Sequence, residues 1–414
     1  MIAKGEHKIF YGYVVAASAF FIQMVGLGMF VTYGVFFNSF LMEFAWSRAV
    51  ISGASSLSFF VFGLLGILAG RLNDKIGPRI IMASCGVFLG VGFALMSQIQ
   101  SVWQLYLFYG LVTAIGFSAM DVATLSTIAR WFVKKRGMMS GIIKVGAGVG
   151  ILLMPLVANW LILSYGWRTS YVIMGSIVLV FIVFVAQFLK RDPGQMGLLP
   201  DGEEKTSVSQ FHSKESGLSL QEAIHVKQFW MLCTIYMLFG FCLQIVLVHA
   251  VPYAIDLGAS PTSAASILSI VGGGSIAGRF IMGSASDKIG NKRAHVICFA
   301  FLSAAFICLS VSNELWTLYL FAALYGFAHG GLWALVSPMV AKLFGMGSHG
   351  AIFGVVYFII TVGGTIGPVL AGHIFDVTSG YQLVFLVCVT FSVIATILVL
   401  FLKLTTYAKA ERGY

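Results

Sequence analysis

The chain has 414 residues, of which 59% are hydrophobic and only 10% are charged. Soluble domains carry a charge at about one residue in four, so this composition argues against a water-soluble enzyme and for a membrane protein. A bilayer is crossed by about 20 helical residues, which leaves room for about a dozen spans and for no large soluble domain. The six cysteines lie inside apolar stretches without Cys-x-x-Cys spacing, so we expect neither disulfides nor a metal site.

Twelve apolar stretches follow one another along the chain and fall into two sets of six. The first set comprises residues 10–37, 47–70, 79–97, 103–129, 138–163 and 168–189. The second set comprises residues 229–254, 262–286, 294–312, 315–341, 350–373 and 382–402. We therefore predict an all-α membrane protein with twelve transmembrane helices in two six-helix bundles.

The bundles are predicted to be separated by a single long polar stretch. Residues 1–190 form the N-terminal bundle, residues 191–227 a cytoplasmic linker loop, and residues 228–414 the C-terminal bundle with a short cytoplasmic tail. Near the end of the linker, Ser219 is followed three residues later by Glu222. This spacing is typical of a capping box, so a short helix is expected to begin there.

The basic residues assign the two sides of the membrane. Of the 25 Lys and Arg, all but four lie in the termini and in the even-numbered loops between predicted spans. The exceptions are Arg48 and Arg168 in the opposite loops and Lys144 and Arg279 inside spans. The positive-inside rule therefore places both termini in the cytoplasm. The net charge of +10 is explained by topology, and no nucleic-acid partner is expected.

The two halves repeat the same motifs at a constant spacing of 213 residues. Residues 70–77, Gly-Arg-Leu-Asn-Asp-Lys-Ile-Gly, recur as residues 283–290, Gly-Ser-Ala-Ser-Asp-Lys-Ile-Gly. Residues 103–108 recur in the same way as residues 316–321. The constant offset indicates a duplicated six-helix unit. Secondary transporters are often built from such repeats, with the substrate site at their interface near the membrane midplane.

The repeated Gly-x-x-x-Asp-Lys-x-Gly loops resemble the signature of the major facilitator superfamily, and the resemblance covers nearly the whole chain. Residues 11–15, 131–150 and 191–202 further resemble motifs of the monocarboxylate transporter family in its microbial form, close to the oxalate–formate exchanger branch. The resemblance implies a multi-pass transporter of the plasma membrane, the inner membrane in a prokaryote, that works as a monomer without a cofactor. The residues expected to form the conformational motif are Gly70, Asp74, Gly77, Arg79, Asp287 and Gly290.

Small residues are spaced for close helix packing. The Gly-x-x-x-Gly pairs at 66–70, 146–150 and 274–278 let helix backbones approach one another. Close packing of the two halves is also what a rocking motion requires, so these pairs are candidates for either kind of contact.

Arg279 is the first of three strong charges inside predicted spans, the others being Asp121 and Lys144. Such charges are costly in a membrane and are functional candidates, and none has a charged counterpart in the other half. Arg279 precedes the loop edge by seven residues, about 10 Å, which puts its guanidinium near the midplane. A guanidinium grips a carboxylate with two parallel hydrogen bonds. The resemblance implies the same role, since the eighth-span Arg of monocarboxylate transporters is taken as the carboxylate anchor; a role in assembly is the alternative.

Asp121 and Lys144 lie at similar predicted depths on adjacent antiparallel helices, so we expect them to form a pair. The pair is either a structural salt bridge or a proton-responsive group near the pathway. Together with Arg279 it leaves one net positive charge, which suits one monoanion.

The chain departs from the animal family members, which carry an Asp one turn before the eighth-span Arg. Ser275 occupies that position here. The proton site must then lie elsewhere, and the candidates are Asp121, Asp256, Glu43, His249 and His329. The exchangers pair the Arg with a Lys in span eleven, but residues 353–361 contain no cation. One anchor fits one carboxylate, because a second buried charge would lack a partner.

These observations predict a secondary active transporter of small monocarboxylates, such as lactate, pyruvate and short-chain acids, in symport with a proton by alternating access. An anion exchanger for formate or for dicarboxylates such as oxalate is the alternative. The lipid bilayer is the other partner, and no motif of a membrane enzyme or of an ATP-driven motor occurs. The residues expected to bind substrate are Arg279, Tyr33, Lys144, Ser275, Trp333, Tyr357 and Phe358.

Overall fold

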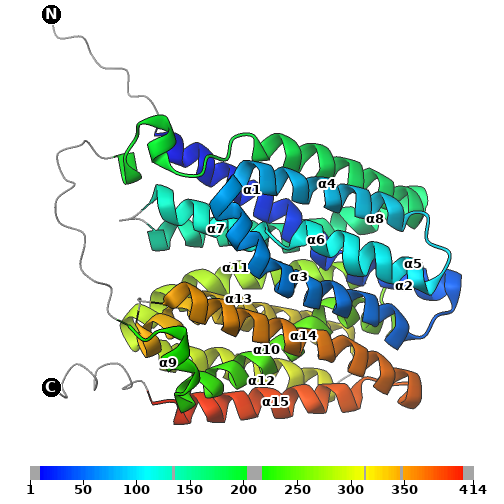
Figure 1. Cartoon of the computed structure of the whole chain (residues 1–414). Coiled ribbons are helices and arrows are strands. Elements are labelled where there is room, and N and C mark those ends of the chain that lie inside the picture. Colours follow the sequence, from blue (N-terminus) through cyan, green and yellow to red (C-terminus); the bar gives the residue numbers. More distant parts are fainter. Residues whose placement is uncertain (1–9, 133–135, 203–216, 312–313, 346–347, 404–414) are drawn as a thin grey trace, which may run out of the picture.

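The computed structural model of the chain describes residues 10–132, 136–202, 217–311, 314–345 and 348–403. Within these ranges, eleven helices are long and apolar enough to cross a membrane. Figure 1 shows them side by side with roughly parallel axes. Large apolar side chains also cover the outside of the molecule, including Leu163 and Val311, which are 61% and 77% exposed. An apolar surface of this kind suits contact with lipid rather than with water.

The first half is built from nine helical segments. In chain order they are α1 (Tyr11–Val31), α2 (Tyr33–Phe44), α3 (Arg48–Ile76), α4 (Pro78–Met96), α5 (Val102–Leu105), a π-helical segment (Tyr106–Thr113), α6 (Ala114–Phe117), α7 (Met120–Trp131) and α8 (Arg136–Ala186). The pair α1 and α2 forms the first predicted span. Helix α3 extends beyond its apolar stretch, because the chain stays helical through residues 70–76. The helix ends at Gly77, which has a φ of 87°.

Helix α8 contains the fifth and sixth predicted spans in one run of 51 residues. Its backbone leaves the helical region at Gly166, with φ of 76° and ψ of 158°. Because a positive φ strains any residue that has a Cβ, glycine is the residue suited to this bend. The eleven candidate spans of the described residues therefore correspond to the predicted twelve.

The second half repeats the arrangement after a short surface helix. Its elements are α9 (Leu220–Ile224), α10 (Lys227–Asp256), α11 (Pro261–Ile289), α12 (Asn291–Val311), α13 (Leu315–Phe344), α14 (His349–Thr378) and α15 (Gln382–Phe401). The capping box predicted for α9 is confirmed. The Glu222 N–H donates to Ser219 Oγ at 3.2 Å, and the Ser219 N–H donates to the Glu222 carboxylate at 2.7 Å. Residues 203–216 of the predicted linker lie outside the described residues.

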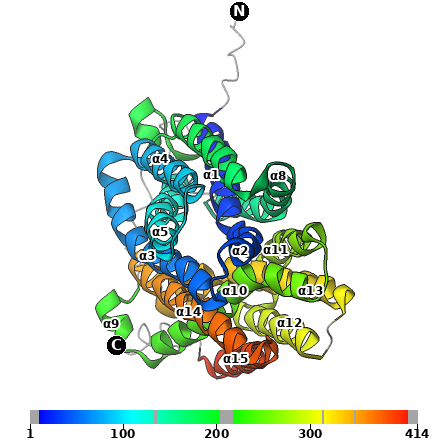
Figure 2. The same ribbon diagram turned by 90° about the vertical axis from the view of Figure 1, so that its right-hand side faces the viewer.

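Three pairs of helices make the most extensive contacts between the described parts of the two halves. Helix α8 packs against α11, α3 against α14, and α2 against α10, as the view along the helices shows (Figure 2). Helix α1 begins and α15 ends at the same end of the molecule (Figure 1). Any group held between the halves is therefore surrounded by helices from both.

The predicted glycine pairs bring helices together within each half. A Cβ on Gly150 of α8 would collide with the backbone of α1, and one on Gly278 of α11 would collide with the backbone of α13. Between the halves, other glycines allow the close approach. A Cβ on Gly272 would collide with the backbone of α8, and one on Gly364 with the ring of Phe59 on α3. The same packing device thus serves both the bundles and their interface.

Candidate functional site

A cavity of about 660 Å³, counted with the space that opens to solvent, lies between the two halves. The centres of water-sized spheres can occupy about 80 Å³ of this space. One water needs about 10–15 Å³ by this measure, so the cavity can hold a small organic molecule. Its polar lining residues are Asp121, Lys144, Gln244, Arg279, His329, Trp333 and Tyr357. Its apolar lining residues are Leu27, Phe30, Val31, Phe59, Phe62, Phe117, Ala147, Ile151, Leu243 and Leu247.

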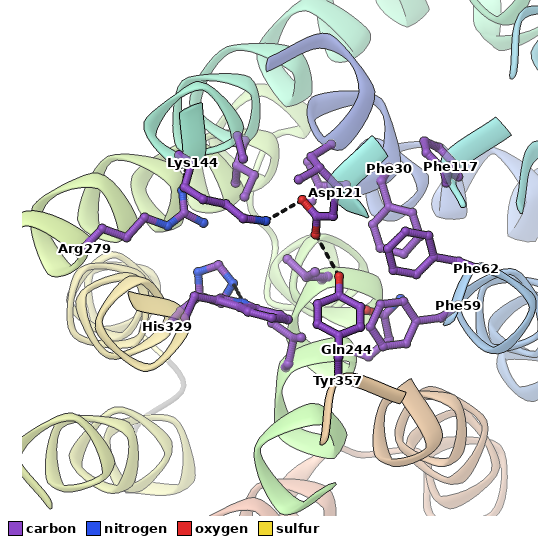
Figure 3. A pocket seen from close by; sticks show the side chains of 17 residues that line it. Phe30, Phe59, Phe62, Phe117, Asp121, Lys144, Gln244, Arg279, His329 and Tyr357 are labelled. Atoms are coloured by element: carbon purple, nitrogen blue, oxygen red, sulfur yellow. Dashed lines mark hydrogen bonds and ion pairs between the residues drawn. The ribbon is translucent and has the colours of Figure 1, made fainter. Parts of the chain in front are cut away.

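The carboxylate of Asp121 is the centre of a hydrogen-bond network that joins the halves (Figure 3). Lys144 forms an ion pair with its Oδ1, as the sequence predicts, and Gln23 donates to the same oxygen at 2.7 Å. Tyr357 of the second half donates from its hydroxyl to Oδ2 at 2.8 Å. Asp121 also lies in the first turn of α7, where the helix dipole favours a negative charge. The buried charge is thereby well compensated.

Arg279 reaches from α11 toward the first half, and its Nη1 donates to the main-chain carbonyl of Lys144. Its Nε is buried and makes no hydrogen bond to the described residues. Nor does its guanidinium form an ion pair with a carboxylate within the part of the chain that the structure describes. A cation that lines a cavity without a counter-ion is what the capture of an anion requires.

His329 is held as a neutral ring behind this cation. The indole N–H of Trp333 donates to His329 Nε2 at 3.1 Å. Because an indole can only donate, Nε2 must carry a lone pair and Nδ1 the proton. Nδ1 then donates to Ser275 Oγ at 3.0 Å. Both ring nitrogens are therefore engaged, which argues against His329 as the proton carrier in this arrangement.

Three of the predicted substrate residues are absent from the described lining of the cavity. Ser275 stands behind His329, and Phe358 packs on Phe60 with ring centroids 6.0 Å apart. Tyr33 is only 2% exposed and donates from its hydroxyl to the carbonyl of Ile51 at 2.6 Å. Their helices are apolar all round, so the sequence alone does not tell which face meets the cavity. Arg279, Lys144, Trp333 and Tyr357 do line it.

A second network joins the halves at the opposite end from the start of α1. Arg48, the first residue of α3, donates from Nη2 to Asp256 at 2.7 Å and from Nη1 to the hydroxyl of Tyr381 at 2.8 Å. The carboxylate of Asp376 accepts from the backbone N–H groups of Arg48 and Ala49, each at 3.0 Å. An acidic residue of the second half therefore caps a helix of the first.

Arg48 also closes a ring of hydrogen bonds with Tyr381, His249 and Ser52, which we call the Arg48 ring. The main-chain carbonyl oxygen of Pro368 lies 3.0 Å from His249 Nε2. Because a carbonyl oxygen can only accept a hydrogen bond, Nε2 carries the proton of the ring. Tyr381 then donates to His249 Nδ1 at 2.8 Å, and Nε2 donates to Ser52 Oγ at 2.9 Å. Ser52 donates in turn to the carbonyl of Arg48 at 2.6 Å. Two of the proton candidates, His249 and Asp256, thus belong to this network and not to the cavity.

The remaining predicted residues lie outside both networks. Glu43 pairs with Arg168 at 2.6 Å and accepts from Trp167 at 2.6 Å, all within the first half. Arg79 donates to Gln187 at 2.6 Å, also within the first half. Of the motif residues, Gly290 has a φ of 88° and ends α11 just as Gly77 ends α3. The side chain of Asp74 lies outside the described part of the structure. A Cβ on Gly70 would approach the side chain of Val122 to 3.0 Å, so this part of α3 packs closely on α7. Asp287 lies in the last turn of α11.

The sequence interpretation missed Gln23, Gln244, Asp376 and Tyr381, and it placed Arg48 in a loop. The two glutamines carried a usable signal, because each is a lone amide inside an apolar stretch. The others lie near span ends, where polar residues are common and only the fold brings them together.

Two repeated six-helix halves with a charged cavity between them define a secondary membrane transporter. The family model described as Major Facilitator Superfamily matches residues 12–255 and 232–413, and the chain belongs to this superfamily. The comparisons thus confirm the predicted superfamily and fold class. They also support a transporter and not an enzyme.

The relatives of the chain include named monocarboxylate transporters and an uncharacterised transporter of the same superfamily. The chain is 26% identical over 396 residues to rat monocarboxylate transporter 13, covering 92% of this chain and 86% of that protein. It is 25% identical over 416 residues to human monocarboxylate transporter 12, covering 95% and 81%. It is also 26% identical over 352 residues to YhjX, an uncharacterised transporter of the superfamily from Escherichia coli, covering 80% and 84%.

Solved structures share the fold. A bacterial homologue of the human lysosomal transporter Spinster, in an inward-facing and unoccupied conformation, superposes with a TM-score of 0.75 at 18% identity, covering 98% of this chain and 99% of that one. The nucleoside transporter NupG superposes with a TM-score of 0.73 at 13% identity, covering 95% and 99%.

Proposed function

We propose that this protein is a secondary active transporter of small monocarboxylates in symport with a proton, with Arg279 as the carboxylate anchor. The observation that carries the proposal is the guanidinium of Arg279, which lines the cavity without a carboxylate partner among the described residues. An arriving carboxylate would complete its hydrogen bonds and supply its missing counter-charge.

The charge of the cavity supports a substrate with one carboxylate. Lys144 and Asp121 form an ion pair, so Arg279 leaves one net positive charge among the described lining residues. A dicarboxylate such as oxalate would bring a second negative charge without a cation to receive it. The names of the relatives, monocarboxylate transporters 12 and 13, agree with this choice over the exchange of dicarboxylates.

Asp121 is the best candidate for the proton. It is the carboxylate among the described residues that line the cavity, and its partners come from both halves. A substrate anion bound to Arg279 and drawn toward Lys144 adds negative charge beside Asp121. Two like charges in a poorly solvated site favour the uptake of a proton. Anion and proton then cross together without net charge movement against the membrane potential.

Alternating access requires that one side be closed while the other is open. The Arg48 ring and its two flanking carboxylates hold the halves together at the end opposite the start of α1. With both termini in the cytoplasm, as the positive-inside rule predicts, this end faces outward and the cavity is reached from the cytoplasm. One chain supplies all the described residues that line the cavity, which supports a monomer as the working unit.

Uptake into proteoliposomes tests the proposal. Labelled lactate or pyruvate should accumulate when the outside is more acidic than the lumen, and Arg279→Lys should abolish accumulation while the protein still inserts. Arg168→Lys is the matched control, because Arg168 pairs with Glu43 away from the cavity and its substitution should leave accumulation unchanged. Counterflow that ignores the pH gradient would support the exchanger, and no carboxylate movement under either condition would refute the proposal.

A further inference from the structure

One wall of the cavity consists of phenylalanine rings from the first half. Phe30 of α1, Phe59 and Phe62 of α3 and Phe117 of α6 all line it. The ring centroids of Phe30 lie 5.2 Å from Phe117 and 5.7 Å from Phe59, and those of Phe59 and Phe62 lie 5.9 Å apart. Contacts at these distances fix the rings against one another, so the wall is a preformed apolar surface.

This wall faces the anchor across the cavity. In Figure 3, Arg279 lies on one side and the four labelled phenylalanines lie on the other, with Lys144 and Asp121 between them. A carboxylate held by Arg279 therefore points the rest of its molecule past the ion pair toward the rings. The cavity thus has a polar end at Arg279 and an apolar end at the phenylalanines. This separation matches a ligand that has a charged group at one end and an apolar group at the other.

The size of the cavity also exceeds what a carboxylate alone needs. Phe30, Phe59 and Phe62 are each 6–9% exposed, and formate or acetate held at Arg279 would leave this remaining apolar surface uncovered. Covering apolar surface with an apolar group is favourable in proportion to the area removed from water. Larger acids thus gain binding free energy at this wall that small acids cannot gain.

One polar group interrupts the wall. Gln244 of α10 is 1% exposed, and its Oε1 accepts no hydrogen bond within the described part of the chain. Its Nε2 donates to Ser55 Oγ at the long distance of 3.4 Å. A buried amide of this kind that lines a cavity has room for one hydroxyl donor on a ligand.

We infer that the phenylalanine wall is a second subsite for the substrate tail, so that the preferred substrates are monocarboxylates with an aromatic or branched apolar group. This inference rests on the proposed function, because it takes the position of the carboxylate at Arg279 as given. The smallest acids, formate and acetate, become poor substrates. Gln244 admits one hydroxyl on the tail.

Paired substrates test the subsite in proteoliposomes. Phenylpyruvate and pyruvate share the same 2-oxo carboxylate and differ only in the phenyl ring. The ratio of their KM values therefore measures the contribution of the tail to substrate binding. We expect KM for phenylpyruvate to be lower by about ten-fold, since a methylene in a fitted apolar pocket already discriminates by that factor. Phe62→Ala should raise KM for phenylpyruvate by about ten-fold and leave KM for pyruvate within about two-fold. Phe62→Leu should lie between them.

Two controls keep the result interpretable. Phe88→Ala removes a phenylalanine that is 42% exposed on the outside of α4 and should change neither KM. Isothermal titration with phenylpyruvate measures binding directly for a variant that folds but does not transport.

The outcomes separate the two proposals. Equal KM values for the two acids, or a parallel rise in both for Phe62→Ala, would overturn the tail subsite while pyruvate transport upholds the proposed function. If neither acid binds nor is transported by the wild-type protein, the proposed function fails and the subsite fails with it.

Discussion

The cavity and the Arg48 ring both connect the two halves of the molecule, but they differ in how completely their polar groups are paired. Around the ring, Arg48, Tyr381, His249 and Ser52 pass hydrogen bonds from one to the next and back to the start. In the cavity, Arg279 Nε and Gln244 Oε1 have no partner among the described residues. A closed network stabilises one arrangement of the halves, whereas an open one is completed by a ligand.

Substitution of Arg279 should have the largest effect on transport. Arg279→Lys keeps the charge but loses the planar fork, so we expect uptake to fall by about 100-fold or more. The measurement is the initial rate of pyruvate uptake per folded molecule, with reconstitution efficiency checked by gel. A rate near that of the wild-type protein would remove Arg279 from the anchor role.

Opening the ring should have the next largest effect, and it should act on conformation. Arg48→Ala removes two hydrogen bonds to a charged group, each worth about 1.5–3 kcal/mol. The population with the far end open should rise by about ten-fold or more, since about 1.4 kcal/mol corresponds to ten-fold. Spin labels at Met42 and Val377, which are 80% and 70% exposed on opposite halves at that end, report the opening as longer distances.

One outcome of the distance measurement would contradict this prediction. If Arg48→Ala leaves the distances unchanged, apolar packing alone holds the halves together and the ring does not act as a gate. Arg168→Ala is the matched control, because that arginine pairs with Glu43 inside the first half and should leave the distances as they are.

The Asp121–Lys144 pair should show a smaller, conditional effect. Asp121→Asn or Lys144→Gln alone leaves one charge unpaired in the membrane, so each should lower folded yield. The double variant should recover yield and still exchange labelled for unlabelled pyruvate, but without accumulation driven by a pH gradient. If the double variant still accumulates pyruvate in response to the gradient, Asp121 is not the proton site, and Asp256 and Glu43 should be tested next.

The smallest expected effect concerns Gln244. Gln244→Leu removes the acceptor from the phenylalanine wall, so phenylpropionate should bind as well as before or slightly better. Its para-hydroxy derivative should lose affinity by about five-fold, the loss of one hydrogen bond. Competition against labelled pyruvate measures both constants. An equal change for the two acids would indicate that the amide does not meet the tail.

The sequence predicted the fold well because its signals are long and redundant. Twelve apolar stretches, the bias of basic residues and the repeat at 213 residues all agree, and each survives an error of a few residues at any boundary. Arg279, Lys144 and Asp121 could be selected as candidates for the same physical reason, since a charge inside an apolar stretch is costly wherever it points.

The other residues of the site are determined by the direction in which each side chain points, and an apolar sequence does not encode that direction. Tyr33 and Tyr357 are both aromatic residues inside spans, yet one is sealed against Ile51 and the other reaches Asp121 across the interface. The phenylalanine wall was missed for this reason, because a span rich in phenylalanine has no polar face to give its orientation. The role of Arg48 between the halves was missed because its partners lie more than 200 residues away in the chain, and only the packed halves bring them together.

The division of roles between cavity and ring is tested most directly by equilibrium binding of labelled phenylpyruvate to purified Arg279→Lys and Arg48→Lys variants, measured side by side. We expect Arg279→Lys to lose binding by about 100-fold and Arg48→Lys to keep it within about ten-fold, because in the proposed site only Arg279 contacts the anion. Retained binding in Arg279→Lys, or a loss of equal size in both variants, would contradict this division of roles.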